Sequence, residues 1–282
     1  MSQNMKNLDR LVPVMMDFHV HLFPDRLFDA IWKYFSKDYG WDVIHRLYRH
    51  DCIRYLRERS VGPIVFSNYA HKRGVAAGLN RWNLEVLEDD PDLYCFAAYH
   101  PDDEDGPTMA REVLSHPRVL GFKLQLLVQR FYPHDERLFP LYDLVMEKGK
   151  RMLLHVGNGP VGNEFVGLEN FEKLMRRYPD LPVNVAHMGS LEYRAFFDLL
   201  PDYPGLMFDT SFAYLAGLGH VCDVPREDLE RHRDRIVYGS DFPNVILPRE
   251  DEIEYLLGLD LSEDFYRKVF YDNGMRLIGG QG

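Results

Sequence analysis

Short apolar runs alternate with longer amphipathic stretches along nearly the whole chain. Eight of these runs are bounded by turn-forming residues, and they cover 13–17 and onward, 63–68, 93–99, 119–125, 151–156, 182–187, 205–210 and 235–241. Consecutive apolar positions are typical of strands that are buried on both faces, as in a parallel sheet. The pattern therefore predicts eight parallel strands.

The stretches between the runs have the spacing of amphipathic helices. Residues 75–88 place Leu79, Trp82 and Val86 near one face, and similar segments cover 138–148, 168–178 and 191–200. Alternating strands and helices are the pattern of βαβ units. An α/β fold of the (β/α)8 TIM-barrel type needs about 250 residues, which fits the 282 residues of this chain. We expect one barrel domain over residues 1–282, because the chain contains no linker, low-complexity tract or internal repeat.

Two segments are longer than a minimal barrel requires. Residues 24–60, after the first predicted strand, have room for more than one helix, so we expect a helical insertion there. Residues 211–234, before the last strand, are also long. Loops of this kind commonly cover the active site. Their aromatic residues could stack on a substrate ring or form a small core within the loops, and the sequence leaves both alternatives open for Phe23, Trp32, Tyr34, Trp41, Phe212 and Tyr214.

Composition narrows the classes of function. The net charge of −11 disfavours nucleic acid as a partner, because an acidic chain repels phosphate backbones. The three cysteines, Cys52, Cys95 and Cys222, form no CxxC pair, so we expect free thiols rather than disulfides or a zinc–thiolate site. No apolar stretch approaches the roughly 20 residues that cross a bilayer, and the N-terminal residues do not have the pattern of a signal peptide. We therefore expect a cytoplasmic protein without a membrane partner.

The candidate chemistry lies at the ends of the predicted strands. His19 and His21 end the first strand, His155 the fifth, His187 the sixth and Asp241 the eighth. In a (β/α)8 barrel the C-terminal strand ends meet at one mouth, where catalytic residues gather. We therefore expect these five side chains to converge on one site.

A divalent metal would use such a set of residues. His19 and His21 are two apart on an extended chain, so both side chains point to one face while Val20 points to the other. Imidazoles with one carboxylate suit Zn²⁺ and related ions such as Mn²⁺, and they leave a position for water, whose pKa the metal lowers towards about 7. Asp241 could bind the metal and also accept a proton from that water. Taken singly, each residue also has a structural explanation, such as Asp241 capping the following helix; their joint occurrence favours the metal site.

The segments HVH, LLHVGN, NVAHMG, YGSDFP and YDNGMRLIG resemble the amidohydrolase superfamily over residues 14–278. Within it, the chain is most similar to the amidohydrolase-2 group, which includes aminocarboxymuconate-semialdehyde decarboxylase, aromatic-acid decarboxylases and the lactonase for pyrone dicarboxylate. The resemblance implies that His19, His21, His155 and Asp241 hold a divalent metal. It also implies that His187 polarises the substrate or shuttles a proton, and that residues 273–277 form a terminal helix. Members of this group often form homodimers.

The resemblance leaves the number of metal ions open. Two-metal members often carry a carboxylated lysine on the fourth strand, where this chain has Lys123. We favour an unmodified lysine that pairs with a carboxylate or with the substrate, and therefore one metal. His100 and His71 follow predicted strands and could contact a small-molecule substrate, as could Arg73, although a solvated loop position is the slightly favoured interpretation for Arg73.

Two reactions use the same ligands. In a hydrolase, activated water attacks a small carboxylate, lactone or amide substrate, with Asp241 as the base. In a decarboxylase, the metal binds the carboxylate of an aromatic or muconate-type acid, and carbon is protonated as CO2 leaves. We favour the hydrolase because hydrolysis is the commoner chemistry of the superfamily, which is an argument by analogy. A non-enzymatic scaffold is disfavoured, since none of the expected ligands is missing.

Overall fold

The computed structural model describes residues 2–279, and eight parallel strands form its centre. The strands follow one another around the sheet in chain order, and each pairs with the next. They are β1 (Met15–His21), β2 (Val61–Ser67), β3 (Leu93–Ala98), β4 (Val119–Gln125), β5 (Arg151–His155), β6 (Val183–Val185), β7 (Leu206–Asp209) and β8 (Ile236–Val237). Beyond β8 the chain runs beside β1, where Asp241 N donates to His19 O at 2.8 Å. The sheet thus returns on itself as a barrel, which confirms the predicted fold class.

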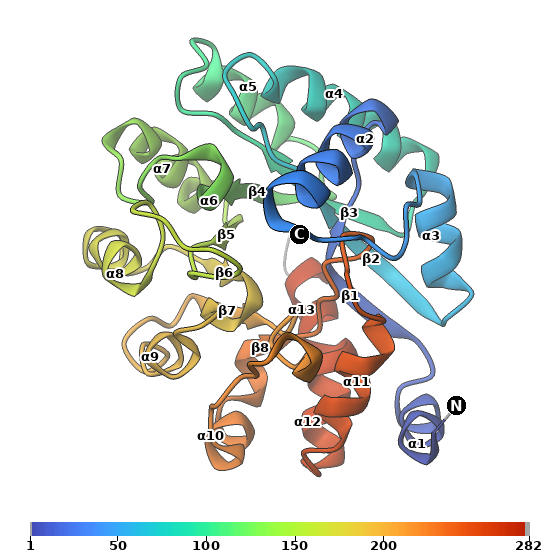
Figure 1. The fold of residues 1–282 in the computed structure, drawn as a ribbon. Coiled ribbons are helices and arrows are strands. Elements are labelled where there is room, and N and C mark those ends of the chain that lie inside the picture. Colours follow the sequence, from blue (N-terminus) through green and yellow to red (C-terminus); the bar gives the residue numbers. More distant parts are fainter. Residues whose placement is uncertain (1, 280–282) are drawn as a thin grey trace.

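The chain also forms helices, and most of them surround the barrel on its outside (Figure 1). They are α1 (Gln3–Leu11), α2 (Asp25–Tyr34), α3 (Arg49–Arg57), α4 (Ala76–Asp89), α5 (Gly106–Val113), α6 (Leu126–Gln129), α7 (Phe139–Glu147), α8 (Leu168–Arg177), α9 (Tyr193–Phe197), α10 (Arg226–Arg231), α11 (Arg249–Leu257), α12 (Glu263–Arg267) and α13 (Asn273–Gly279). Shorter 3-10 or π-helical turns are η1 (Phe35–Tyr39), η2 (Glu136–Leu138), η3 (Ala186–Gly189), η4 (Ala216–Leu218), η5 (Arg233–Arg235) and η6 (Lys268–Asp272). Residues 24–60 contain α2, η1 and α3, so the predicted helical insertion after the first strand is confirmed.

The strands separate two apolar layers. Phe18 points into the barrel and packs edge-on against Phe96, with ring centroids 6.0 Å apart. The register of β1 shifts between Asp17 and Val20, so Val20 points the other way and belongs to the larger cluster between the strands and the outer helices. Because both faces of each strand are covered, the strands consist of nearly continuous apolar runs. This is the physical reason why the runs could be recognised in the sequence.

The last helix closes one end of the barrel. Ile278 of α13 belongs to the apolar cluster of the barrel interior, and Figure 1 shows α13 close to the barrel axis rather than in the outer ring. Asn273 Nδ2 donates to the carbonyl oxygens of Arg233 and Ile236, both at 2.7 Å, and so joins the start of α13 to β8. The expected terminal helix is therefore present, and the site residues lie at the opposite end.

Two strands are shorter than the apolar pattern predicts. β6 ends at Val185 and β8 at Val237. The chain then leaves the sheet, and His187 (φ 56°) and Asp241 (φ 59°) adopt left-handed backbone conformations. The prediction that these two residues end their strands is thus wrong in detail, because both lie in the turns that follow.

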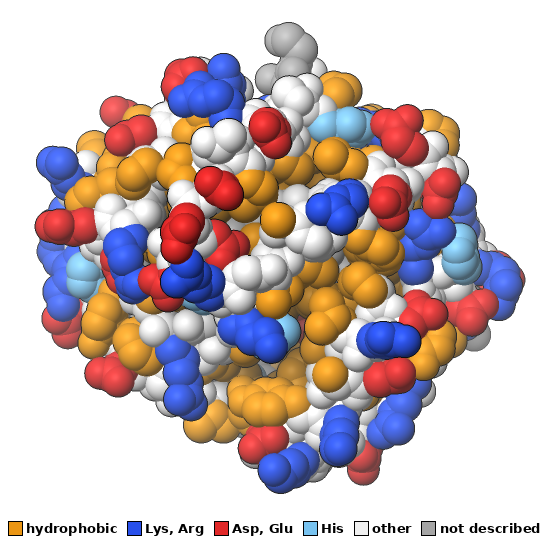
Figure 2. Space-filling model, turned by 90° about the horizontal axis from the view of Figure 1, so that it is seen from above, with side chains coloured by type: hydrophobic (Ala, Val, Ile, Leu, Met, Phe, Trp, Pro, Cys, Tyr) orange, Lys and Arg blue, Asp and Glu red, His pale blue; other side chains and the backbone are white. Residues whose placement is uncertain are grey.

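The surface carries both signs of charge. On the face shown in Figure 2, acidic and basic side chains are interspersed, and no stripe of one sign crosses that face. All three cysteines are buried and free, as predicted. Within residues 2–279, no helix combines the length and the apolar character that crossing a membrane requires.

Candidate metal centre and substrate pocket

His19 and His21 present their imidazole rings to the same carboxylate. The Nε2 atom of His21 lies 2.9 Å from Asp241 Oδ1, and the Nε2 atom of His19 lies 3.2 Å from the same oxygen. Both histidines are buried, whereas the Asp241 side chain is 15% exposed. Alternation along β1 produces this arrangement, since Val20 between the two histidines points into the outer core.

The hydrogen bonds of the two rings determine which nitrogen carries the proton. His19 Nδ1 lies 2.9 Å from Asp209 Oδ2, and His21 Nδ1 lies 3.2 Å from the carbonyl oxygen of Ser67. A carboxylate and a carbonyl only accept, so each Nδ1 donates and each Nε2 presents a lone pair. Lone pairs from two imidazoles and from Asp241 therefore meet at one point, which is repulsive unless a proton or a metal cation lies among them. This mixed nitrogen and oxygen donor set fits a divalent ion of the zinc type.

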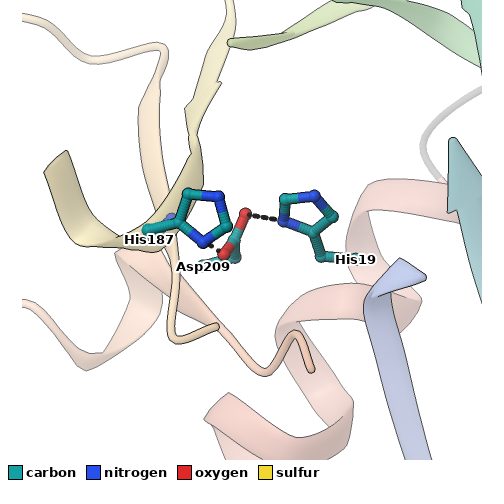
Figure 3. Close-up of side chains that lie close together, drawn as sticks. All are labelled: His19, His187 and Asp209. Carbon is teal, nitrogen blue, oxygen red and sulfur yellow. Dashed lines mark hydrogen bonds and ion pairs between the residues drawn. The ribbon is translucent and has the colours of Figure 1, made fainter. Parts of the chain in front are cut away.

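Asp209, at the end of β7, lies behind His19 and connects the two sides of the mouth. Its Oδ1 accepts hydrogen bonds from the backbone N of His187 at 3.0 Å and from Ser211 Oγ at 2.5 Å, while Oδ2 contacts His19. Figure 3 shows the carboxylate between the rings of His19 and His187. Burial alone would raise the Asp209 pKa, but the contacts with His19, His187 and Ser211 together outweigh burial and hold the pKa below its usual range. Gly239 permits this packing, since a Cβ there would lie 2.7 Å from His19 Cβ.

A second compact group of potential ligands consists of His19, His187 and Asp209. Asp209 is fully buried, and donors already occupy both of its oxygens. Asp241, by contrast, lines the pocket described below. A metal that contacts a substrate therefore fits better beside Asp241, and Asp209 serves to orient the His19 ring.

Lys123 lies beside this centre and not in the pocket wall. Its Nζ is 3.3 Å from His19 Nε2, and the side chain is completely buried. Burial lowers the Lys123 pKa to about 8, against the raising effect of Asp209 and Asp241. The lysine thus offsets part of the negative charge of the two carboxylates.

His155 and His187 face each other on the other side of the mouth. His187 Nε2 lies 3.1 Å from His155 Nδ1. The remaining nitrogen of each ring donates to a backbone carbonyl oxygen, His155 Nε2 to Gly159 at 2.9 Å and His187 Nδ1 to Ser211 at 3.0 Å. Burial lowers the pKa of both imidazoles, that of His187 to about 4. Among residues 2–279, His155 belongs to neither group of three potential ligands.

The turns at the mouth contain several non-glycine residues with positive φ. His187, Met188, Phe212 and Asp241 have φ values of 56°, 50°, 59° and 59°. Such conformations cost roughly 1–3 kcal/mol each and persist only where surrounding contacts impose them. One such contact is the carboxylate of Asp209, which accepts from the backbone N of His187 and stabilises that turn.

A pocket of about 330 Å³ opens beside these residues. Four of the predicted site residues line it, namely His21, His155, His187 and Asp241. Much of the remaining wall is apolar and includes Phe35, Tyr39, Trp41, Tyr69, Leu127 and Phe212. Three of these aromatic residues come from residues 24–60, so the helical insertion contributes to the pocket, as expected of a long loop in a barrel.

The loop aromatics divide between pocket and core. Trp41 and Phe212 line the pocket and stack on each other, with centroids 5.9 Å apart and an interplanar angle of 7°. Phe23 and Trp32 belong instead to a buried cluster under the insertion. Tyr214 is buried in the outer core and Tyr34 is exposed, so the two alternatives left open by the sequence apply to different residues.

Three predicted substrate contacts lie away from the pocket. His71 and Arg73 are exposed, and Arg73 forms an ion pair with Glu104. His100 is buried and packs edge-on against Phe131, with ring centroids 5.9 Å apart. None of the three is among the described residues that line the pocket. Their contact with substrate stays a prediction that this geometry does not support.

The sequence did not assign roles to Asp209 and Ser211. Their position at or just past the end of the apolar run 205–210 is the signal that could have marked them as polar residues of the mouth. Their partners could not be read from the sequence, because the contact between His19 and Asp209 joins residues 190 positions apart.

Solved structures similar to this chain have the same barrel at low sequence identity. An uncharacterised TIM-barrel protein from Bordetella bronchiseptica is 17% identical with a TM-score of 0.72, and the match covers 95% of this chain and 99% of that chain. A 5-carboxyvanillate decarboxylase from Novosphingobium aromaticivorans, complexed with manganese and 4-hydroxy-3-methoxy-5-nitrobenzoic acid, is 13% identical with a TM-score of 0.68, covering 96% and 97%. A candidate 2-pyrone-4,6-dicarboxylic acid hydrolase from Acinetobacter baumannii, with citric acid bound, is 14% identical with a TM-score of 0.63, covering 94% and 99%. These likenesses establish the fold.

The family follows from the sequence itself. The family model described as Amidohydrolase, that of the amidohydrolase-2 group, matches residues 16–280 of the 282. No protein with a curated description matches the chain. The match spans the strands, the turns and the terminal helix that carried the resemblance, and the chain therefore belongs to the amidohydrolase-2 family of enzymes.

Proposed function

We propose that this amidohydrolase binds one divalent metal through His19, His21 and Asp241, with His155 as a fourth ligand. Zinc is the proposed ion, and manganese is the alternative, as bound in the decarboxylase structure described above. One observation carries the proposal, namely that the Nε2 lone pairs of His19 and His21 both face Asp241 Oδ1. The carboxylate of Asp209 behind His19 is the kind of second partner that metal-binding histidines commonly have.

We propose hydrolysis of a small carboxylate, lactone or amide as the reaction. A divalent ion bound here would supply Lewis acidity to the substrate oxygen and to water. Asp241 is the only carboxylate among the described residues that line the pocket, so it is the proposed general base and then acid. With His155 Nδ1 given to the metal, a proton on His187 Nε2, which lies 3.1 Å from that nitrogen, would provide the donor that stabilises a developing oxyanion.

The alternative reaction is decarboxylation of an aromatic or muconate-type acid. The aromatic walls of the pocket favour it, since Trp41, Phe212 and Tyr69 are suited to a planar ring. Asp241 or the pair of His155 and His187 would then deliver the proton to the ring carbon. Release of CO2 from an aromatic monoacid, measured beside hydrolysis of aromatic lactones and amides, separates the two reactions.

Metal content of the purified protein, measured by elemental analysis before and after incubation with zinc or manganese, tests the central proposal. We expect about one equivalent per chain in the wild type and a large loss in Asp241→Ala and His155→Ala. His50→Ala, which removes an exposed histidine, is the matched control and should keep the metal. About two equivalents would make Lys123 and His187 candidate ligands, and no binding of either ion would overturn the metal-dependent mechanism.

A cytoplasmic location and a homodimer remain part of the proposal. The three buried free thiols are compatible with a reducing compartment. Light scattering of the purified protein over a range of concentrations would test the dimer.

A further inference from the structure

The pocket wall contains no fixed positive charge. Among the described residues that line it, none is lysine or arginine. The polar groups in the wall, apart from the site histidines and Asp241, are Gln125, Ser190, His220 and Asn244 together with two tyrosines. A carboxylate placed against this wall would therefore lose water without gaining an ion pair.

The cations near the mouth lie outside the pocket lining. Lys123 lies beside the metal centre, with its Nζ 3.3 Å from His19 Nε2, and is buried outside the pocket lining. Arg73 pairs with Glu104, and Arg137 pairs with Asp102 and Asp135. Arg130 is exposed and close enough to Tyr39 of the pocket wall to offset part of the rise that burial causes in the pKa of that tyrosine. None of these four side chains is among the described residues that line the pocket, so none contacts a second anionic group placed against the wall.

The charge available at the metal centre matches one anion. A divalent ion with Asp241 as its carboxylate ligand has a net charge of about +1, since neutral imidazoles add none and the charges of Lys123 and Asp209 beside His19 cancel each other. One carboxylate or one polarised carbonyl of the substrate satisfies that charge. A second carboxylate on the same molecule would have to lie against the wall, where an unpaired buried charge is strongly unfavourable.

The remaining wall is suited to an uncharged ring. The rings of Trp41 and Phe212 lie nearly parallel, with centroids 5.9 Å apart. The ring of Phe212 also packs edge-on against the ring of His187, again with centroids 5.9 Å apart. Tyr69 stands edge-on to His21 at 6.2 Å. These aromatic faces flank the two sides of the mouth, so a planar molecule that reaches the metal centre contacts them with its far end.

We propose that the substrate has a single anionic or carbonyl group that binds at the metal centre and an uncharged aromatic ring in the apolar pocket, and that dicarboxylates are rejected. The inference rests on the proposed metal-dependent function and narrows its substrate class. It distinguishes this chain from the similar structure named for a 2-pyrone-4,6-dicarboxylic acid, whose two carboxyl groups need two partners.

The experiment compares the binding of benzoate and isophthalate, which differ by one carboxylate on the same ring. Isothermal titration calorimetry on the zinc-loaded protein gives both dissociation constants without requiring turnover. We expect isophthalate to bind at least about tenfold more weakly than benzoate, which corresponds to at least about 1.4 kcal/mol. Leu218→Arg adds a cation to the pocket wall. In this variant the ratio of the isophthalate to the benzoate dissociation constant should fall to about one or below.

The control adds the same charge at the other end of the molecule. Val14 precedes β1 and is 45% exposed, so Val14→Arg changes the net charge equally but should leave the ratio as in the wild type. If zinc binds but isophthalate binds as tightly as benzoate, or neither binds, the substrate class is overturned while the metal site stands. If zinc does not bind, the proposed function fails, and the inference fails with it.

Discussion

The two sides of the barrel mouth present their histidines in opposite ways. On the side of β1 and β8, His19 and His21 both direct Nε2 at the carboxylate of Asp241. On the side of β5 and β6, His155 and His187 direct their lone pairs at each other, 3.1 Å apart and without a carboxylate between them. In both pairs the outer nitrogen donates to an acceptor behind the ring, so the inner nitrogen presents a lone pair. Two of these lone pairs also face a side-chain donor, since Lys123 Nζ lies 3.3 Å from His19 Nε2 and Gln125 Nε2 lies 3.0 Å from His155 Nδ1.

The difference shows how one barrel mouth can bind a metal on one side and donate or accept protons on the other. A carboxylate adds negative charge and so favours a cation on the β1 and β8 side. Two neutral imidazoles without a carboxylate attract a cation less strongly, so His155 serves as an additional ligand while His187 Nε2 remains available to carry a proton. We therefore expect Asp241 to determine metal affinity and His187 to determine the rate of reaction.

Asp241→Asn tests this difference between the two sides, and its expected effect on metal affinity is the largest. Removing the negative charge where the lone pairs of His19 and His21 converge should weaken metal affinity by more than about 100-fold, since even partners behind the ligands contribute about 10–100-fold. His187→Asn should retain the metal and lose turnover. Competition with a chromophoric chelator measures the affinity of both variants. Equal loss of metal in both would show that the two sides act as one ligand set.

Local periodicity predicted the β1 side well and the β5 and β6 side less well. The placement of His19 and His21 on one face needs only the two-residue period of a strand. The turns that carry His187 and Asp241 depend on positive φ values that no sequence rule at these positions required. The pairing of Arg73 with Glu104, which leaves Arg73 outside the pocket, likewise depends on tertiary packing. The sequence therefore predicted the barrel, and which strand ends carry chemistry, better than it predicted side-chain partners.

Asp209→Asn is expected to have an intermediate effect on metal affinity. An amide can donate to His19 Nδ1 where the carboxylate only accepts, which would move the ring proton to Nε2 and block that lone pair. We expect metal affinity to fall by about 10–100-fold while the unfolding temperature changes little. Ser211→Ala is the matched control, because it removes the hydroxyl beside Asp209 but keeps the contact between Asp209 and His19. A larger loss in Ser211→Ala than in Asp209→Asn would contradict the orienting role of Asp209.

The smallest expected effect is on the pH dependence of stability, and it arises at the loop that carries Phe212 between the two sides of the mouth. Glu252 of α11 is buried and accepts from the backbone N of Tyr214 at 3.2 Å. Burial raises the Glu252 pKa well above its ordinary value of 4.5, against the lowering effect of the backbone N–H groups of Tyr214 and Phe212. The folded protein therefore retains a proton that the unfolded chain releases, and stability should fall as pH rises from about 4.5 towards the folded pKa, by at most about 1.4 kcal/mol per pH unit.

Glu252→Gln keeps an acceptor oxygen in the same place and removes this titration. We expect urea unfolding between pH 4.5 and 8 to show a shallower loss of stability in the variant than in the wild type. Asp251→Asn removes a charge from the exposed face of the same helix and controls for net charge. A wild-type stability that instead rises with pH relative to Glu252→Gln would mean that the ionised carboxylate is the form that holds the loop. Phe212 would then depend on a buried anion, and the apolar wall between the two sides of the mouth would be less neutral than its lining suggests.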